Sequence, residues 1–323
     1  VQKGETRVHD KHIFTSEMKM SGFKDVKFKQ FEPGTYSKYR YEDLNPNNDS
    51  NDRECKLVPE YTNRVFSKPT SFVNECIYNE QMACELIHNT LVEAVRKRVD
   101  NTERDIACLL SGGLDSSLIC GIVTRCLREQ GKKIKLNTWS IGLEGSEDIK
   151  YARKVAEYIG SEHHEIIVSE KEFLDYIKKV IYDIESYDTT TVRASVGNWL
   201  ISKYISETSE SKVIFNGDGS DEVCGGYMYF HASPNSIDFD KECRKLLKNI
   251  HYFDVLRSDR SISSHGLEAR TPFLDRNFVQ SYLSIPIDLR NHKKNNQCEK
   301  YLLRKAFEGR NIIPDEILWR TKE

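Results

Sequence analysis

Residues Ser111 to Ser117 read Ser-Gly-Gly-Leu-Asp-Ser-Ser and join an apolar run that begins at Ile106 to a helix-like pattern. This order predicts a strand, a phosphate loop and a helix. Gly112 and Gly113 allow successive backbone N–H groups to converge on an anion near the positive end of the helix, and the serine hydroxyls add donors. Asp115 has the same sign of charge as a phosphate, so its presence indicates a Mg²⁺ ion between them. The loop therefore predicts a site for a metal-bound polyphosphate.

The loop differs from a Walker-type loop, because it contains no G-x-x-x-x-G-K-[ST] pattern and no lysine that could reach a terminal phosphate. Transfer of a γ-phosphoryl group is therefore disfavoured. The pattern S-G-G-x-D-S-S instead resembles the PP-loop of ATP pyrophosphatases, which release the β- and γ-phosphates together as pyrophosphate. That resemblance implies adenylation of a substrate by ATP. The structural alternative is a glycine-rich turn between a strand and a helix.

A second candidate loop, Asn216 to Glu222, follows a short strand-like run over residues 212–215. Strand patterns alternate with helix patterns here, which predicts a parallel sheet with ligands beyond the carboxyl ends of its strands. Both loops are then expected at one edge of the sheet. Carboxylates beside a polyphosphate repel it unless they share Mg²⁺ or face an ammonium group, so Asp221 joins Asp115 as a predicted metal ligand. The alternative is an ordinary solvated acidic turn.

Three further segments carry candidate binding residues. The start of a predicted helix at residues 185–195 combines hydroxyl groups with Arg193, which suits a carboxylate ligand, although capping by Thr189 or Thr190 would explain the same hydroxyls. Asp254 and Arg257 lie one helical turn apart, where a surface ion pair is the commoner arrangement. Around Lys300 the local sequence does not separate a catalytic cation from a solvated helix face.

The chain has 323 residues, of which 38% are hydrophobic, enough for one large domain or two. The 48 basic and 50 acidic residues are mixed along the sequence, which argues against a nucleic-acid partner. Nine cysteines without a C-x-x-C pair indicate reduced thiols in a cytoplasmic protein. No apolar run is long enough to span a bilayer, so no membrane association is expected.

The patterns also predict the order of the elements. Short strands are expected at residues 12–18 and 28–36, a loop or linker around residues 45–51, and a long helix over residues 74–99. Strands at 134–141 and 164–168 flank a helix at 149–159, and helices are expected at 173–184 and 192–206. From residue 240 onward the pattern is helical.

Six motifs in the same order resemble glutamine-hydrolysing asparagine synthetases, over the synthetase domain and nearly all of this chain. They begin at Ser111 (SGGLDSS), Ser140 (SIGLEGSED), Thr190 (TTVRAS), Gly219 (GSDE, followed by GGY at Gly225), Gly266 (GLEARTPFLD) and Glu299 (EKYLLR). The resemblance implies an adenine-nucleotide α-hydrolase-like fold. It also implies a ligase of amino-acid biosynthesis: ATP converts aspartate to an aspartyl-adenylate, and ammonia, supplied from glutamine in the full-length enzyme, displaces AMP to give asparagine.

The resemblance also implies roles for individual residues. Leu110 and Ile141 would contact adenine with their backbones, and Ser111, Gly112, Gly113, Asp115, Ser116 and Gly217 would hold ATP or pyrophosphate with Mg²⁺. Thr190, Arg193, Asp254 and Arg257 would surround aspartate. Lys300 would stabilise charge at the α-phosphate, and Asp218 and Tyr227 complete the predicted catalytic set.

Two departures from the family pattern follow. Residues 1–45 resemble only the last part of the glutaminase domain, so residues 46–73 are interpreted as a linker and residues 74–323 as a synthetase domain shortened at its end. The family's Ser-Gly-Glu-Gly loop reads Asn216-Gly217-Asp218-Gly219 here, which leaves the role of the missing glutamate open. Two other functions stay open, a β-lactam synthetase-like amide ligase and a nucleotide-binding module without catalysis. A homodimer is one arrangement that the sequence leaves open.

Overall fold

The structure is a computed structural model and describes residues 13–21, 28–43, 55–64, 72–131, 135–294 and 296–321. The chain divides into two compact units, Val1–Lys68 and Pro69–Glu323. Among the described residues no helix has the length and apolar character needed to cross a membrane.

The first unit contains one β-hairpin. Its strands, Thr35–Asp43 (β1) and Cys55–Arg64 (β2), pair antiparallel with a register shift between Lys38 and Tyr39, and a short 3-10 helix, η1 (Met18–Ser21), precedes them. The strands expected at residues 12–18 and 28–36 are corrected here, since no strand forms over the described residues 13–17 or 28–34. Strand β2 lies within residues 46–73, the stretch interpreted as a linker. Strand β2 lacks the clean apolar alternation that marks a strand in sequence, so its pairing with β1 determines it.

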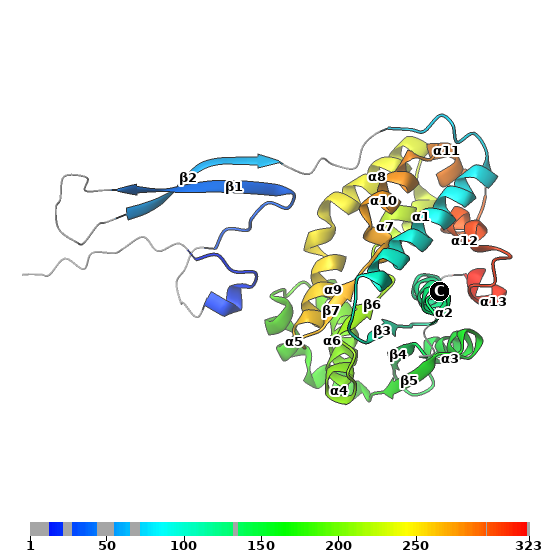
Figure 1. Cartoon of the computed structure of the whole chain (residues 1–323), viewed down its shortest axis with the longest axis horizontal. Coiled ribbons are helices and arrows are strands. Elements are labelled where there is room, and N and C mark those ends of the chain that lie inside the picture. Colours follow the sequence, from blue (N-terminus) through cyan, green and yellow to red (C-terminus); the bar gives the residue numbers. More distant parts are fainter. Residues whose placement is uncertain are drawn as a thin grey trace, which may run out of the picture. The chain divides into compact units, whose positions relative to one another are not determined.

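The second unit is built around a parallel five-stranded sheet in the order β5-β4-β3-β6-β7 (Figure 1). The strands are Ile106–Leu109 (β3), Asn137–Gly142 (β4), Glu162–Ile167 (β5), Val213–Phe215 (β6) and Glu268–Arg270 (β7). Since β4 and β5 extend the sheet on one side of β3 and β6 and β7 on the other, the strand order reverses between β3 and β6. Ligands of open α/β sheets bind at such a reversal, beyond the carboxyl ends of the strands.

Helices cover both faces of this sheet (Figure 1). Cys108 and Phe215 point into the larger apolar cluster, whereas their neighbours Ala107 and Ile214 point into the opposite one, as the two-residue period of a strand requires. The larger cluster is completed by α1 (Glu80–Asp100), α2 (Leu114–Glu129), α3 (Glu147–Ile159), α10 (Arg276–Ser284), α12 (Tyr301–Phe307) and α13 (Asp315–Leu318). On the other face lie α6 (Thr189–Thr208) and α9 (Asp254–Ser263), with α5 (Ile177–Ile184) packed against α6.

The remaining elements connect these layers. They are α4 (Glu170–Asp175), α7 (Ser220–Cys224), η2 (Met228–Ala232), α8 (Ser236–Asn249), η3 (Ile250–Tyr252), η4 (Pro272–Leu274) and α11 (Ile287–Arg290).

The predicted parallel sheet flanked by helices is confirmed, with differences at the element ends. The long helix begins at Glu80 because the side chain of Asn79 accepts a hydrogen bond from the Met82 N–H at 2.9 Å and caps it. The helix expected over residues 173–184 is two helices, α4 and α5. Beyond residue 240 the chain is not wholly helical, since β7 pairs with β6. Its sequence, Glu-Ala-Arg, has no apolar pattern, so only the partner strand makes it a strand.

Candidate active site

The phosphate loop lies between β3 and α2, at the reversal of the strand order. Gly112 has a φ of +77°, and a Cβ there would lie 2.6 Å from the backbone N of Ala152 and 2.7 Å from the carbonyl O of Asp148, both on α3. Gly113 is the N-cap of α2 and provides no side-chain cap. The first N–H groups of a 16-residue helix therefore stay free of a side-chain cap, as an anion-binding loop requires.

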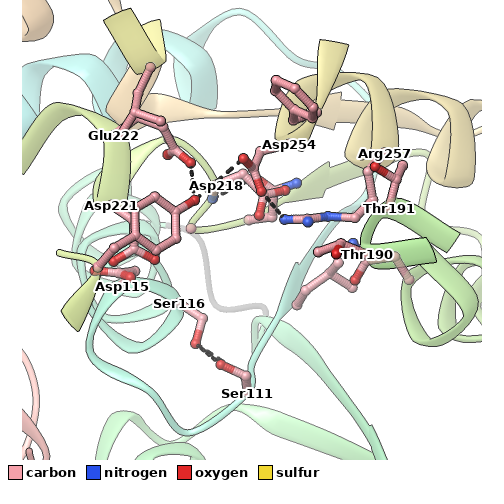
Figure 2. Close-up of a pocket in the computed structure, with 18 of the residues that line it drawn as sticks. Ser111, Asp115, Ser116, Thr190, Thr191, Asp218, Asp221, Glu222, Asp254 and Arg257 are labelled. Atoms are coloured by element: carbon pink, nitrogen blue, oxygen red, sulfur yellow. Dashed lines mark hydrogen bonds and ion pairs between the residues drawn. The ribbon is translucent and has the colours of Figure 1, made fainter. Parts of the chain in front are cut away.

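Two serine hydroxyls face each other across this loop (Figure 2). The hydroxyl oxygens of Ser111 and Ser116 lie 2.9 Å apart, and the Ser111 N–H donates to the Ser116 hydroxyl at 3.1 Å. The loop thus holds its hydroxyl donors in place before any ligand arrives.

The acidic loop after β6 packs directly on the phosphate loop. A Cβ on Gly217 would lie 2.7 Å from the Ser116 backbone N, so only glycine allows the two chains to approach this closely. Next to it, the Ser220 hydroxyl donates a 2.8 Å hydrogen bond to Oδ1 of Asp115. The predicted meeting of the two loops at one edge of the sheet is confirmed by this contact.

Lys300 links the two loops from a distant part of the chain. Its Nζ lies 2.6 Å from Oδ2 of Asp115 and 2.6 Å from Oδ1 of Asp221, and the lysine side chain is only 3% exposed. Burial favours the neutral amine, but the two carboxylates outweigh burial and hold the pKa of Lys300 above its usual range. The residue also has a φ of 55°, a left-handed conformation that costs free energy for any side chain but glycine. A buried, charged cation therefore stands beside the phosphate loop.

The same two carboxylates fit the predicted Mg²⁺ ion. Both are partly exposed, at 23% for Asp115 and 21% for Asp221, and they already share one cation, the Lys300 ammonium. Among the described residues no group of three or more His, Cys, Asp or Glu side chains could hold a metal alone. A Mg²⁺ ion here would take its other ligands from phosphate oxygens and water, the usual arrangement for Mg²⁺ with nucleotides.

A cavity of about 660 Å³ opens beside the two loops. Its far wall includes Thr190 and Thr191 from the start of α6, and Asp254 and Arg257 from α9 (Figure 2). The guanidinium of Arg257 donates to Oδ1 of Asp254, and both side chains are about one-fifth exposed. They thus face the cavity as a partly buried pair. The α6 cap comes from Asp188, which accepts from the Thr191 N–H at 2.8 Å, so neither Thr189 nor Thr190 serves as the cap.

Tyr227 joins two acidic side chains at the cavity wall. Its hydroxyl donates to Oε1 of Glu222 and lies 3.4 Å from Oδ2 of Asp254. Burial and the nearby Asp254 carboxylate raise the pKa of Glu222 to about 8, while burial and Glu222 raise the pKa of Tyr227. The tyrosine is therefore a neutral hydrogen-bond donor that orients two carboxyl groups.

Asp218 lines the cavity between the phosphate loop and α9. Burial raises the pKa of its carboxyl group. The neighbouring Asn216 points its amide toward α9, where Nδ2 donates to the Ser258 hydroxyl at 2.7 Å, and its Oδ1 accepts from the Asp218 N–H at 3.3 Å. Asn216 thus supports the backbone that carries Asp218.

Most of the predicted site residues come together here. The cavity is lined by Ser111, Asp115, Ser116, Thr190, Gly217, Asp218, Asp221, Tyr227, Asp254 and Arg257. Leu110 and Gly112 lie next to this lining, and Ile141 packs among apolar side chains on the α6 side of the sheet. Arg193 is exposed on α6 and is not among the lining residues, although it lies only three residues after Thr190 on the same helix. Its predicted contact with a substrate stays a prediction.

Sequence reasoning missed three side chains at the site. Glu222 was part of a quoted motif but received no role, although an acid next to Asp221 in a short acidic run was a usable signal. Ser220 holds Asp115, and its hydroxyl gave no sequence signal. Arg320 lies near the phosphate loop and donates toward the Gly112 carbonyl, and its position near the end of the given sequence offered no pattern to read.

Fold and site together define a class, an α/β domain with its Ser-Gly-Gly loop at the strand-order reversal of a parallel sheet. A model of the asparagine synthase family matches residues 86–242 and 233–323. The chain belongs to this family, so the resemblance seen in the sequence is confirmed.

Individual relatives agree with the family. The chain is 52% identical over 230 residues to the asparagine synthetase [glutamine-hydrolyzing] of Gallus gallus and 51% identical to that of Homo sapiens. Each match covers 71% of this chain and 40% of the relative. Solved structures similar to this chain include an NH3-dependent NAD synthetase from Campylobacter jejuni (18% identity, TM-score 0.32, 54% of this chain and 75% of that one). Another is an NMN synthetase from Francisella tularensis, with 11% identity and a TM-score of 0.34, and this match covers 71% of this chain and 91% of that one.

Proposed function

We propose that this chain carries out the synthetase reaction of its family, in which ATP activates the side-chain carboxylate of aspartate and ammonia then forms asparagine. One observation supports this most directly. Lys300, buried and charged, lies 2.6 Å from carboxylates of both loops, Asp115 and Asp221, and these two carboxylates line the same cavity as the Asp254–Arg257 pair. Groups suited to a polyphosphate and groups suited to an amino acid thus share one site.

In the first step an aspartate side-chain oxygen attacks the α-phosphorus of ATP, and the bond from that phosphorus to the β-phosphate bridging oxygen breaks. The guanidinium of Arg257 suits the α-carboxylate of the substrate, and the carboxylate of Asp254 suits its ammonium group. Mg²⁺ held by Asp115 and Asp221 would neutralise charge on the phosphates. The Lys300 ammonium lies beside the phosphate loop, where a cation stabilises the negative charge that develops on the α-phosphate.

In the second step the nitrogen of ammonia attacks the acyl carbon of aspartyl-adenylate, and the bond from that carbon to the AMP oxygen breaks. The attacking nitrogen must lose a proton. Asp218 is the proposed acceptor, because burial raises the pKa of its carboxyl group and makes its carboxylate a stronger base than an exposed aspartate.

The test is direct. The purified chain is incubated with ATP, Mg²⁺, aspartate and ammonium chloride, and AMP, pyrophosphate and asparagine are each quantified. We expect pyrophosphate release that requires aspartate and asparagine that requires ammonium. If ATP binds but no AMP forms with aspartate, the chain is a nucleotide-binding module and the proposal is wrong. If AMP forms with another amino acid only, the substrate is misassigned.

A cytoplasmic location is also proposed, supported by the cysteine usage: Cys76, Cys84, Cys108, Cys120, Cys126, Cys224, Cys243 and Cys298 are free in the structure. The homodimer and the assignment of residues 1–45 to the end of a glutaminase domain stay predictions. Light scattering on the purified chain tests the first of these.

A further inference from the structure

The side chain of Asn216 is buried, at 4% exposed, and both ends of its amide are engaged within the protein. Its Nδ2 donates to the hydroxyl of Ser258 on α9 at 2.7 Å, and its Oδ1 accepts from the Asp218 N–H at 3.3 Å. The backbone N–H of Asn216 donates to the Arg270 carbonyl on β7 at 3.1 Å. Asn216 is therefore fixed to the sheet, and it links α9 to the loop that carries Asp218.

Ser258 completes this link from α9. It is 1% exposed and is not among the residues that line the cavity. A serine hydroxyl can donate one hydrogen bond while its oxygen accepts another. Because the Ser258 oxygen accepts from Asn216, its proton is free for a second partner, and that partner is the Asp218 carboxyl group. A serine inside a helix usually bonds a carbonyl of its own helix or faces water. Ser258 instead bonds the loop after β6.

The three residues form a closed ring of hydrogen bonds. The Asp218 N–H donates to Asn216, the Asn216 amide donates to Ser258, and the Ser258 hydroxyl donates to the Asp218 carboxyl. A hydrogen bond to a carboxylate is stronger than one between neutral groups, and it favours the ionised form. Burial raises the pKa of Asp218, and the Ser258 bond and the charge of Arg257 oppose that rise. The ring thus holds both the backbone and the side chain of Asp218.

A fixed carboxylate is what the second step of the proposed reaction requires. A proton acceptor must lie within about 2.6 to 3.2 Å of the atom that loses the proton. The Asp218 carboxyl has two oxygens, so one can accept from Ser258 while the other serves the cavity, which Asp218 lines together with Asp254 and Arg257 (Figure 2). We propose, resting on the function proposed above, that Ser258 is a positioning residue that acts with Asn216 and directs the Asp218 carboxylate toward the attacking ammonia.

The test replaces Ser258 by alanine, which removes the hydroxyl. Two rates are measured: pyrophosphate release in a single turnover with ATP, Mg²⁺ and aspartate, and asparagine formation after ammonium chloride is added. Pyrophosphate release and the KM for aspartate should stay within about twofold of wild type, because the phosphate loop and the Asp254–Arg257 pair are untouched. Asparagine formation should slow by about tenfold or more, the equivalent in rate of one hydrogen bond to a charged group.

Two other variants separate the hydrogen bond from packing. Ser261 is a second buried serine of α9, and within the described part of the chain its hydroxyl has no hydrogen-bond partner. Ser261→Ala is therefore the matched control, and we expect wild-type rates in both steps. Ser258→Cys keeps a side chain of similar size but offers only a weak donor, so we expect an intermediate loss of asparagine formation. It also serves if thermal unfolding shows that Ser258→Ala does not fold.

A double-mutant cycle identifies the group through which Ser258 acts. In an Asp218→Asn background, Ser258→Ala should slow asparagine formation by less than about a further twofold, because the carboxylate that it positions is already gone. Full additivity of the two substitutions would overturn the inference. So would equal losses in both steps, a loss matched by Ser261→Ala, or full activity in Ser258→Cys.

The wild-type rates distinguish this inference from the proposed function. If the wild-type chain forms pyrophosphate and asparagine but Ser258→Ala slows neither step or both alike, the positioning role is wrong and the proposed function stands. If the wild-type chain releases no pyrophosphate with aspartate, the proposed function is wrong, and the positioning role that rests on it is wrong as well.

Discussion

Gly226 lies against the cation that joins the two loops, and replacing it by alanine tests that geometry with a single methyl group. A Cβ at this position would lie 1.9 Å from Cε of Lys300 and 2.1 Å from Oδ1 of Asp221. The backbone cannot easily retreat, because the Gly226 N–H donates to the Asp221 carbonyl at 2.9 Å. Gly226 does not have a positive φ, so alanine would strain the site only through its clashes with the side chains of Lys300 and Asp221.

The size of the effect follows from these distances. Carbon atoms in contact need roughly 3.5 Å, so Cε of Lys300 must move by about 1.6 Å, the difference between 3.5 Å and 1.9 Å. A shift of that size breaks at least one of the two 2.6 Å contacts that Nζ makes with Asp115 and Asp221. Displacing a catalytic group by 1 Å can cost about a hundredfold in rate. We therefore expect Gly226→Ala to slow aspartate-dependent pyrophosphate release by about a hundredfold.

The assay measures pyrophosphate release with saturating ATP and aspartate, alongside thermal unfolding. Gly197→Ala is the matched control, since a Cβ on Gly197 meets its nearest neighbour, Phe173, at an ordinary 3.8 Å. We expect that control to keep wild-type activity. In a double-mutant cycle, adding Gly226→Ala to Lys300→Ala should cost less than adding it to the wild type, because the 1.9 Å clash with the lysine is gone and only the 2.1 Å contact with Oδ1 of Asp221 remains.

Two results would refute this reasoning. One is Gly226→Ala with pyrophosphate release within about threefold of wild type, which would show that Lys300 tolerates the displacement or takes no part in adenylation. The other is full additivity with Lys300→Ala, which would show that the methyl group acts through something other than the lysine.

Three further predictions concern single residues. Lys300→Ala should lower the adenylation rate by about a hundredfold or more and leave the Kd for ATP nearly unchanged, and the reverse pattern would remove Lys300 from the catalytic step. Asp218→Glu should speed asparagine formation from ammonia with little change in pyrophosphate release, because one more methylene extends the reach of the proton acceptor; equal losses in both steps would contradict this. His292 is buried between His231 and Phe239 and its two ring nitrogens have no hydrogen-bond partner within the described structure. Burial lowers the pKa of His292 from 6.5 to about 4. As the pH falls, the unfolded chain therefore binds a proton at a higher pH than the folded chain does. The free energy of unfolding should then fall by about 3 kcal/mol between pH 6.5 and pH 4. Urea unfolding at each pH checks this, and the fall in the free energy of unfolding should be smaller in His292→Gln than in the wild type, because the contribution of His292 is gone.

The sequence alone determined the parts that depend on local pattern. Two adjacent glycines between a strand and a helix predicted the phosphate loop, and Gly112 indeed adopts a positive φ where a Cβ would strike α3. Alternating strand and helix patterns predicted the parallel sheet, and that sheet brings the acidic loop to the same edge. Local motifs therefore predicted most of the residues that line the cavity.

Short elements without a sequence pattern of their own could not be predicted from the sequence. Strand β7 is three residues with mixed polarity, and it forms because β6 offers it a pairing edge. Strand β2 forms inside a stretch that looked like a linker, since β1 supplies its partner. The sequence predicted that Arg193 contacts a carboxylate, and the structure shows this residue exposed on α6, so that contact stays a prediction.

Only the tertiary structure decided the electrostatics of the site. The phosphate loop has no lysine of its own, and the cation it lacks comes from Lys300, 185 residues after Asp115. The local sequence does not show whether that lysine is buried and paired or solvated, because its burial and its two carboxylate partners come from distant segments of the chain. Its catalytic role stays a proposal. Arg320 likewise comes close to the loop in the folded chain, where its guanidinium lies 3.8 Å from the centroid of the Tyr151 ring. The interaction energy between charged groups depends on their distance in space, which the fold sets. Backbone conformation depends largely on the residue and its neighbours in sequence.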